Sequence, residues 1–540
     1  MTSSPTSQCR QARAAGGRRN LAGLSLALAG SLALVACGGS STAKKATAAS
    51  TATVLRIPFF DDMGVPDPDV FYAAEGLMVT NGVYDNLLQY ADDSNKVVGD
   101  LADLPTVSAD GRTYTFKLHP GVTFHDGTPV NAEAVAASFA RRTALQQGPS
   151  YMLAQVKSVA TPDPTTMVVS LKARVSAFLD YLASPWGPKV ISPTAIKQHT
   201  VGNDHGQKWL SSHDAGSGPY SITSFVTGQK YVLTRNDNYW GPKANFREVD
   251  ISIVPSISTQ ELLLQNGQLD MITHGLPTQG LEDLRKKPGL TVHSYTTTLK
   301  NLLFVNPTKG AFSTPAARQA LEQAVDKTKL TQQIFGSTAT PSTQLYPPNE
   351  LPLAATTSIV TYDPSNLKNM ASRLPTKKVD IGYDTTDPNN QEMANFLQTT
   401  LQGLGLQATA RAIPIAQIFA ISSHPATAPT ILIQTTPPDA AHPDTWARIY
   451  MSSSGGGGGA NYMACKDPAV DKELDAGLAS STTAEVDAHY GAAGNLLVKN
   501  GCFIDIANVQ DSIVTRSSLS GLSHVPAMPW NVNLSRLSNG

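Results

Sequence analysis

The chain contains few residue patterns that could carry out covalent chemistry. None of its eleven histidines stands in an HExxH pattern, in which two histidines and a glutamate share one helix face around zinc. Ser217 lies in the sequence GSGPY, which lacks the GxSxG arrangement of a hydrolase nucleophile. The same glycines do not make a phosphate-binding loop, because GxxxxGK is absent and Pro219 removes a donor amide. The sequence therefore predicts no catalytic residue, no bound metal and no cofactor.

Side chains that could bind an organic ligand gather between Asp439 and Tyr462, in the sequence DAAHPDTWARIYMSSSGGGGGANY. Trp446, Tyr450 and Tyr462 offer rings that could stack on a ligand, but aromatic residues at this spacing are also typical of a core. Asp439 is either a solvated loop residue or a partly desolvated carboxylate that could pair with an ammonium group. Glycines 455–459 predict a flexible loop without the geometry of an anion site.

The elements that must position these side chains are clearest in the stretch Thr113–Phe139, TYTFKLHPGVTFHDGTPVNAEAVAASF. Hydrophobic and polar residues alternate in its first six positions, which predicts a half-buried strand. Two Gly-containing turns follow, and Asn131 can accept a hydrogen bond from the first turn of a helix. We expect, in order, a strand at 113–118, a turn, a short strand at 122–124, a second turn and a helix that begins at Asn131.

Elsewhere the periodicity of hydrophobic residues alternates between strand-like and helix-like segments, which is typical of an α/β protein. We predict helices at 75–89, 315–334 and 390–404. We predict strands at 54–57, 158–160, 167–171, 221–226, 230–235, 302–305, 379–383 and 428–434.

Together with the preceding Asp110-Gly111-Arg112, the stretch Thr113–Phe139 resembles the signature of the family 5 extracellular solute-binding proteins. These are the peptide- and nickel-binding receptors of ABC importers. The resemblance runs from about residue 54 to the C-terminus and is densest at 84–139, 216–270, 312–336 and 439–475. It implies a type II periplasmic-binding-protein-like fold, with two α/β lobes, an inserted third small lobe and a ligand cleft between the lobes.

The resemblance also implies how the chain is divided. Residues 54–85, 200–300 and 516–540 would form lobe I, 86–199 the inserted small lobe and 301–515 lobe II. Ahead of them, residues 1–37 resemble a lipoprotein signal peptide, since a basic start and an apolar segment end in Leu34-Val35-Ala36-Cys37. Cys37 would be lipidated; the alternative is ordinary secretion with Cys37 removed. Residues 38–53, rich in Gly, Ser, Thr, Ala and Lys, predict a flexible tether.

The resemblance assigns a role to one acidic residue. Asp439, with Pro443, matches the position at which peptide binders of this family hold the α-ammonium of the ligand. The sequence departs from the family pattern in two places, because Thr435–Pro438 replaces the usual tryptophan and the loop Asp384–Asp387 lacks the arginine that meets a dipeptide carboxylate. The second departure argues against a free dipeptide as the ligand.

Apart from Cys37, two cysteines remain in the mature chain, Cys465 and Cys502. An extracellular compartment permits a disulfide between them, and two buried free thiols are the alternative. Without CxxC spacing they give little support to a zinc site. His442 is the one histidine near the supposed cleft, and we do not expect it to bind a metal.

The functional expectation combines these observations. The chain has 41 Lys and Arg against 42 Asp and Glu, a balance that gives no electrostatic reason to expect nucleic acid as a partner. We expect a monomeric, lipid-anchored substrate-binding protein on the extracytoplasmic side of the cell membrane. It would capture a peptide by lobe closure and deliver it unaltered to the permease subunits of an ABC transporter. The alternatives are a nickel-complex or other non-peptide solute binder, or a secreted hydrolase.

Overall fold

The computed structural model describes residues 53–351, 360–421, 424, 427–454 and 460–540. The predicted signal peptide, Cys37, almost all of the tether and glycines 455–459 lie outside the described residues. Within the described ranges, no helix has both the length and the apolar character that crossing a bilayer would require.

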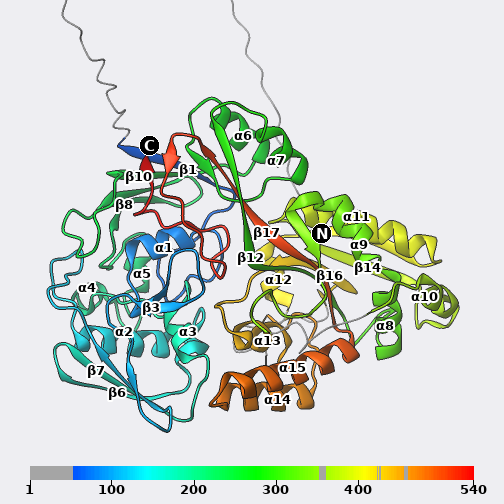
Figure 1. The fold of residues 1–540 in the computed structure, drawn as a ribbon, viewed down its shortest axis with the longest axis horizontal. Helices are drawn as coiled ribbons and strands as arrows, with labels where there is room; N and C mark the ends of the chain where they lie inside the picture. The colour runs from blue at the N-terminus through cyan, green and yellow to red at the C-terminus, as the bar shows by residue number, and fades with distance from the viewer. Residues whose placement is uncertain (1–52, 352–359, 422–423, 425–426, 455–459) are drawn as a thin grey trace, which may run out of the picture. The chain divides into compact units, whose positions relative to one another are not determined.

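Lobe I is built on a four-stranded sheet in the order β1-β10-β9-β8 (Figure 1). β1 is parallel to β10, and the other neighbours are antiparallel. Alternate residues of β1 and β9, such as Leu55 and Leu233, are fully buried in one core, as the period-two pattern predicts. The strands predicted at 54–57, 221–226 and 230–235 are therefore confirmed as β1 (Val54–Phe59), β8 (Tyr220–Val226) and β9 (Lys230–Arg235). The fourth strand, β10 (Glu248–Ile253), was not predicted.

A second, antiparallel sheet carries the stretch that resembles the family signature. Its order is β4-β5-β7-β6, with bounds Thr106–Val107, Thr113–Lys117, Thr166–Leu171 and Val156–Asp163. The helix α2, Ala132–Leu145, begins where expected, because the side chain of Asn131 accepts a hydrogen bond from the amide of Ala134 at 2.9 Å. The predicted strand at 122–124 is wrong. Only Thr123 forms a bridge, to Pro129, and a proline cannot donate the hydrogen bond that would extend a ladder.

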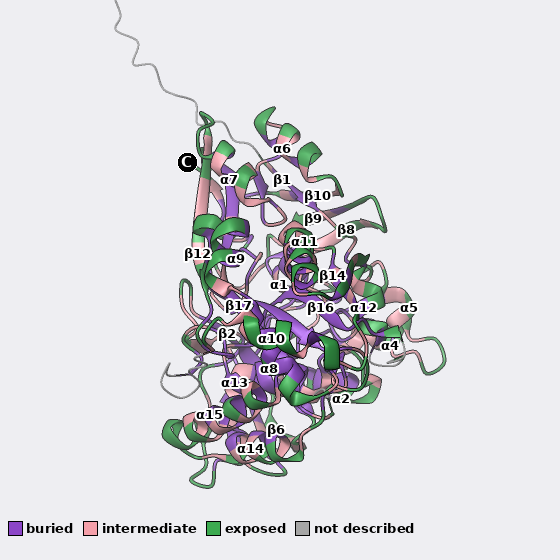
Figure 2. Cartoon of the chain, turned by 90° about the vertical axis from the view of Figure 1, so that its right-hand side faces the viewer, coloured by how far each residue is buried: buried purple, intermediate pink, exposed green. Residues whose placement is uncertain are grey.

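The largest sheet has the order β11-β17-β12-β16-β14-β15, and β13 also pairs with β17. β14 runs parallel to β15 and β16, whereas β12 is antiparallel to both of its neighbours. Every residue of β16 is buried, and Figure 2 shows buried residues concentrated along β16 and β17. The bounds are Met271–Ile272 for β11, Leu290–Val305 for β12, Ala339–Pro341 for β13, Lys378–Asp384 for β14, Gln407–Ile413 for β15, Ile431–Thr436 for β16 and Phe503–Arg516 for β17.

Two long strands of this sheet, β12 and β17, link lobe I to lobe II. They lie side by side along their length, as Figure 1 shows. Ile513 of β17 packs in the core of lobe I with Leu55, whereas Leu303 of β12 and Ile504 of β17 pack in a core of lobe II. The register of the pair shifts between Thr296 and Lys300. An irregularity at this place bends the ladder where the chain passes from one lobe to the other.

Two predicted helices are corrected by the structure. The helix predicted at 75–89 ends early, because α1 spans Leu77–Val83 and the chain then enters β2, Leu88–Tyr90, which pairs with β3, Val97–Gly99. The segment predicted as one helix at 315–334 is two, α8 (Pro315–Ala324) and α9 (Lys327–Ile334). Asp326 causes the second start, since its side chain accepts a hydrogen bond from the amide of Lys329 at 3.0 Å.

The remaining elements complete the lobes. Val532, Leu534 and Leu537 pack in the same core as Leu55, so the C-terminal segment returns to lobe I. The domain boundaries themselves stay a prediction. The bounds are α3 Phe178–Ala183, α4 Pro193–His199, α5 Gln207–Leu210, α6 Ile257–Gln265, α7 Thr278–Leu284, α10 Pro364–Met370, α11 Pro388–Gly403, α12 Ile415–Ile421, α13 Pro443–Met451, α14 Pro468–Ala479, α15 Thr483–Asn500, β18 Leu519–Ser520 and β19 Ser538–Asn539.

Candidate ligand-binding cleft

A cavity of about 160 Å³ lies between the two lobes. Lobe I contributes the segment that leads into α1, together with His274 and Trp530, and the segment after α3 contributes Trp186. Lobe II contributes the ends of β14 and β16 and parts of α12 and α13. The described residues that line it are Asp61, Asp62, Tyr72, Ala73, Ala74, Glu75, Trp186, His274, Asp384, Thr386, Ile415, Phe419, Gln434, Thr435, Thr436, Pro437, Asp439, Ile449, Tyr450, Ala460, Tyr462 and Trp530.

Asp439 lies in this cavity where the lobes meet. It follows β16 and two prolines, and it is only 3% exposed. Its Oδ2 atom accepts hydrogen bonds from the hydroxyls of Tyr72, at 2.6 Å, and Tyr151, at 2.8 Å. Burial raises the pKa of Asp439 to about 7, although the two tyrosines and the positive charge of Arg142 act in the opposite direction. The carboxyl group is therefore held in place by hydroxyl donors and ionises near neutral pH.

The chain fixes the position of Asp439 through its backbone and neighbours. The carbonyl oxygen of Asp439 accepts a hydrogen bond from the hydroxyl of Ser184 at 2.5 Å. Two residues later the amide of Ala441 donates to the hydroxyl of Tyr90 at 2.9 Å. The helix α13 then begins after His442, whose Nδ1 accepts from the amide of Asp444 at 3.2 Å. The loop between β16 and α13 is thus bonded to residues of the N-terminal half of the chain.

A second buried carboxyl, Asp384, lies at the end of β14. The side-chain amide of Gln434 donates to its Oδ2 at 3.2 Å, and the backbone and hydroxyl of Thr386 donate to its Oδ1, each at 2.9 Å. Burial raises the pKa of Asp384 to about 6, against the effect of these hydrogen bonds. No lysine or arginine forms an ion pair with Asp384 or Asp439 among the described residues.

Lobe I adds an ion pair to the cavity wall. His274 Nε2 lies 2.6 Å from Glu75 Oε2. Burial opposes protonation of His274, but the charge and hydrogen bond of Glu75 together with the charges of Asp511 and Asp61 outweigh it, so the pKa of His274 is raised. The pKa of the nearby Asp61 is raised by burial and by Glu75. The ring of Trp530 lies against that of His274, with centroids 5.5 Å apart, and supplies an apolar surface beside these charges.

The sequence comparisons identify the family to which this architecture belongs. Residues 96–458 match the sequence model described as "Bacterial extracellular solute-binding proteins, family 5 Middle". The match covers more than half of the chain. The chain belongs to the family 5 extracellular solute-binding proteins.

The proteins to which this chain is similar are described with different ligands. The chain is 26% identical over 482 residues to the probable D,D-dipeptide-binding periplasmic protein DdpA of Escherichia coli K12, covering 87% of this chain and 92% of that protein. Its fold is similar to that of DppA from Helicobacter pylori in complex with the peptide STSA, with a TM-score of 0.80, 22% identity and coverage of 90% and 98%. NikZ from Campylobacter jejuni in complex with Ni(L-His) gives a TM-score of 0.78, 19% identity and coverage of 90% and 99%. The two-lobed type II periplasmic-binding fold expected from the sequence is thereby confirmed.

The structure places three of the four predicted ligand residues in the cleft of this solute-binding protein. Asp439, Tyr450 and Tyr462 line the cavity, and Trp446 does not. Trp446 is fully buried in the core of lobe II, where its Nε1 donates to the carbonyl oxygen of Leu345 at 3.1 Å. Its indole therefore satisfies a core hydrogen bond, and its assignment as a ligand-contacting residue is corrected.

Several residues that line the cleft were not predicted from the sequence. Tyr72, Trp186, His274 and Trp530 lie far in the sequence from the segment that the motifs singled out. Nothing in their local spacing marks them as ligand contacts. The loop around Asp384, which departs from the family pattern, could have been predicted to contact the ligand, because Asp384 and Thr386 line the cleft.

The cysteines and His442, which the sequence singled out, have structural roles. Cys465 and Cys502 are joined in a disulfide with their Cα atoms 6.4 Å apart. His442 is buried, which lowers its pKa, and its side chain serves as the N-cap of α13. Throughout the described part of the chain, no three His, Cys, Asp or Glu side chains are arranged to hold a metal ion.

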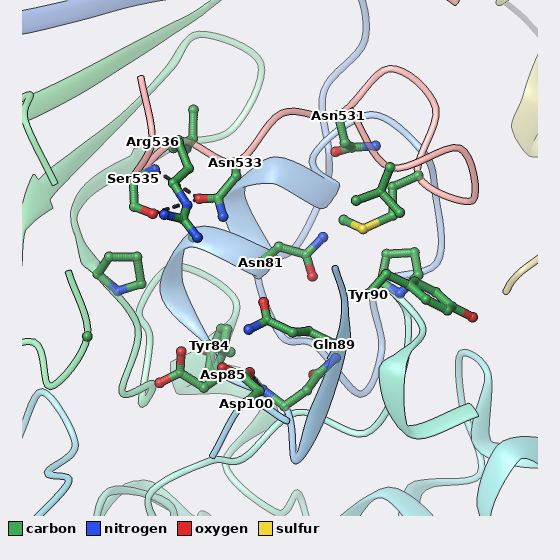
Figure 3. Close-up of a pocket in the computed structure, with 18 of the residues that line it drawn as sticks. Asn81, Tyr84, Asp85, Gln89, Tyr90, Asp100, Asn531, Asn533, Ser535 and Arg536 are labelled. Carbon is green, nitrogen blue, oxygen red and sulfur yellow. Dashed lines mark hydrogen bonds between the residues drawn. The ribbon is translucent and has the colours of Figure 1, made fainter. Parts of the chain in front are cut away.

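A separate cavity of about 190 Å³ lies within the N-terminal half and the C-terminal segment of the chain (Figure 3). Figure 3 shows Asn81, Gln89 and Asp100 among the polar side chains around it. Burial raises the pKa of Asp100 to about 8 and lowers that of Lys189 to about 7. No described residue between 301 and 515 lines this cavity, so it does not bridge the two lobes.

Proposed function

We propose that this protein is the substrate-binding component of an ABC importer, which captures an extracytoplasmic peptide or related amine between its lobes and delivers it unaltered. The observation that carries the proposal is Asp439. This buried carboxyl lines a cavity to which both lobes contribute, and tyrosines from the N-terminal half hold it. A desolvated carboxylate is a strong partner for an ammonium group. The peptide ligands of DdpA and DppA are compatible with such a site.

Capture would proceed through closure of the lobes. The α-ammonium of the ligand would bind Asp439, and its apolar part would lie among Trp186, Trp530 and Phe419, which line the same cavity. A ligand that contacts both lobes binds the closed state more tightly than the open state and so shifts the population toward it. The linking strands β12 and β17, with their irregular register near Thr296, are the place where this motion would be absorbed.

Delivery would take place at the membrane. Lipidation of Cys37 would anchor the chain, and residues 38–53 would leave the folded part free to reach the permease subunits. The protein would act as a monomer on the extracytoplasmic side, and no bond would be broken. Membrane fractionation of cells that express Cys37→Ala tests the anchor. We expect release of the protein from the membrane fraction, and unchanged membrane retention would contradict lipidation at this residue.

Calorimetry with dipeptides to pentapeptides tests the function itself, followed by mass spectrometry of the released ligand. We expect saturable binding and recovery of the intact peptide. Peptide cleavage during incubation would contradict the proposal and support a hydrolase. Binding of nickel with a chelating organic acid, in the absence of any peptide binding, would support the alternative solute class.

A further inference from the structure

The charges of the cleft are strongly one-sided. Five of the described residues that line it carry carboxyl groups: Asp61, Asp62, Glu75, Asp384 and Asp439. His274 is the one described lining residue that can become cationic, and it is already paired with Glu75 at 2.6 Å. None of the described lining residues is lysine or arginine. The internal stretches 352–359, 422–423, 425–426 and 455–459, which the structure does not describe, contain no lysine or arginine in their sequences.

One buried arginine, Arg142, acts on Asp439 from outside the cavity. Arg142 affects the pKa of Asp439 through its charge but does not line the cavity. Its Nε lies 3.1 Å from Asp69, and its guanidinium donates to the carbonyl oxygens of Pro68 and Trp186. It is fully buried. Although its Nη1 atom has no hydrogen-bond partner among the described residues, Arg142 does not line the cleft and so does not face a ligand carboxylate there.

A polar group in the cleft also lacks a partner. Gln434 lines the cavity and is only 4% exposed. Its Nε2 donates to Asp384, but its Oε1 has no hydrogen-bond partner among the described residues. A buried acceptor without a partner costs free energy, which a ligand N–H group placed against it would recover. The unpartnered oxygen of Gln434 is an observation separate from the number of carboxyl groups in the cleft. Like those carboxyl groups, it favours a ligand that donates hydrogen bonds.

We propose that the cleft selects an organic cation that has no free carboxylate, such as a peptide whose C-terminus is amidated, over the corresponding free acid. The proposal rests on the proposed function, since it specifies the ligand class of the same cleft. A ligand amine gains attraction from the surrounding carboxylates, whereas a ligand carboxylate would be desolvated among like charges without a cationic partner. The ligand named for DdpA, a dipeptide, would be disfavoured in its free-acid form.

The ionisation behaviour of the cleft supports this selection. Burial raises the pKa of Asp61, Asp384 and Asp439. Each shift means that the negative form lacks sufficient compensation in the unliganded cleft. A cationic ligand would supply the missing positive charge, and an anionic group would make ionisation of these carboxyl groups still less favourable.

Isothermal titration calorimetry at about pH 7.5 with three matched tripeptides tests the selection. The probes are Leu-Phe-Ala as the free acid, the same tripeptide as its C-terminal amide, and the N-acetylated amide. We expect the amide to bind at least about tenfold more tightly than the free acid, which corresponds to roughly 1.4 kcal/mol. We expect the N-acetylated amide, which lacks the ammonium group, not to bind.

Variants connect the preference to the carboxyl groups of the cleft. Asp384→Asn removes one negative charge and should narrow the ratio of the two affinities about threefold. Asp61→Asn, at a more exposed carboxyl group, gives a second variant if Asp384→Asn does not fold. Asp380→Asn is the control, because Asp380 lies on β14 outside the cavity and pairs with Arg411 at 3.1 Å. It should leave the ratio unchanged.

The possible outcomes separate the selection from the function. Equal affinities for acid and amide, or tighter binding of the acid, would overturn the selection while the proposed function stands. Binding of the N-acetylated amide as tightly as the amide would show that the ammonium group is not what the cleft recognises, and would also overturn the selection. Failure of all three probes to bind, together with failure of the dipeptides to pentapeptides, would overturn both.

Discussion

At the scale of single residues, the cleft depends on carboxyl groups that are buried without a cationic partner. Asp439 is the clearest case, since it is 3% exposed and its hydrogen bonds come from two neutral hydroxyls. Burial of a charge in this way is costly unless a partner is supplied. Ionisation of the Asp439 carboxyl group is therefore unfavourable without a ligand. A ligand ammonium group would stabilise the ionised form. This relation leads to two predictions.

Replacement of Asp439 by Asn should weaken binding of Leu-Phe-Ala amide by about 10- to 100-fold, because a charge-assisted hydrogen bond contributes roughly 1.5–3 kcal/mol. The melting temperature should not fall, since the ionised carboxyl is unfavourable in its buried site. Calorimetry and thermal unfolding check both parts. Asp380→Asn, which changes an exposed carboxyl of the same lobe, is the matched control. Unchanged affinity in Asp439→Asn would remove this residue from the site.

Affinity and stability should respond to pH in opposite directions. The pKa of Asp439 is about 7 in the folded protein, against about 3.9 in an unfolded chain. Its contribution to stability is therefore fully present below about pH 4 and is lost as the pH rises through about 7. Because an ammonium group requires the ionised carboxylate, affinity should instead rise between about pH 5.5 and 7.5. Ionisation of Asp384, with a pKa of about 6, should add a second rise in affinity at lower pH.

Calorimetry in two buffers of different ionisation enthalpy checks this pH dependence, since binding near pH 7 should release a proton. Asp439→Asn should remove the component near pH 7 and leave the one near pH 6. An affinity that is constant or falls over this range would contradict the assigned role.

The sequence could predict part of this site and not the rest. Asp439, Tyr450 and Tyr462 were accessible because they lie in one segment with a recognisable motif. Trp446 was misassigned because it shares a face of α13 with Tyr450, four residues later, and the sequence does not show which side chain of that face turns toward the core. Tyr72 and His274 could not be found, since only the folding of lobe I against lobe II places them in the cleft.

At the scale of elements, the structure follows local signals where hydrogen bonds are local. The start of α2 at Asn131 was predictable because the cap is a short-range contact. The end of α1 was not, because residues 88–90 are drawn into a strand by pairing with 97–99. In lobe II, the disulfide between Cys465 and Cys502 joins the segment before α14 to the start of β17. It thereby ties α14 and α15 to the largest sheet.

Removal of this disulfide by Cys465→Ala together with Cys502→Ala should lower the free energy of unfolding by roughly 3–4 kcal/mol. The estimate follows from the loop entropy released when cysteines 37 residues apart are no longer joined. Denaturant unfolding of the double variant, compared with the reduced and oxidised parent protein, checks the value. Peptide affinity should be unchanged, because neither cysteine lines the cleft. Equal stability of all forms would mean that the bond does not stabilise lobe II.

At the scale of the whole molecule, the two lobes meet at a cavity and are linked by β12 and β17. The two lobes and the return of the C-terminal segment to lobe I were expected from the family resemblance. The polarity of the cleft could not be derived in that way. It results from which side chains of both lobes face the cavity, and these include five carboxyl groups and no described lysine or arginine.

A crystal structure of the protein with Leu-Phe-Ala amide would show directly whether the ligand is held between the two lobes. We predict that the ligand lies between the lobes, with its ammonium nitrogen within hydrogen-bond distance of Asp439 and with its chain, intact, in contact with residues of both lobes. A ligand bound in the cavity around Asn81 and Gln89, or in contact with one lobe alone, would contradict the account.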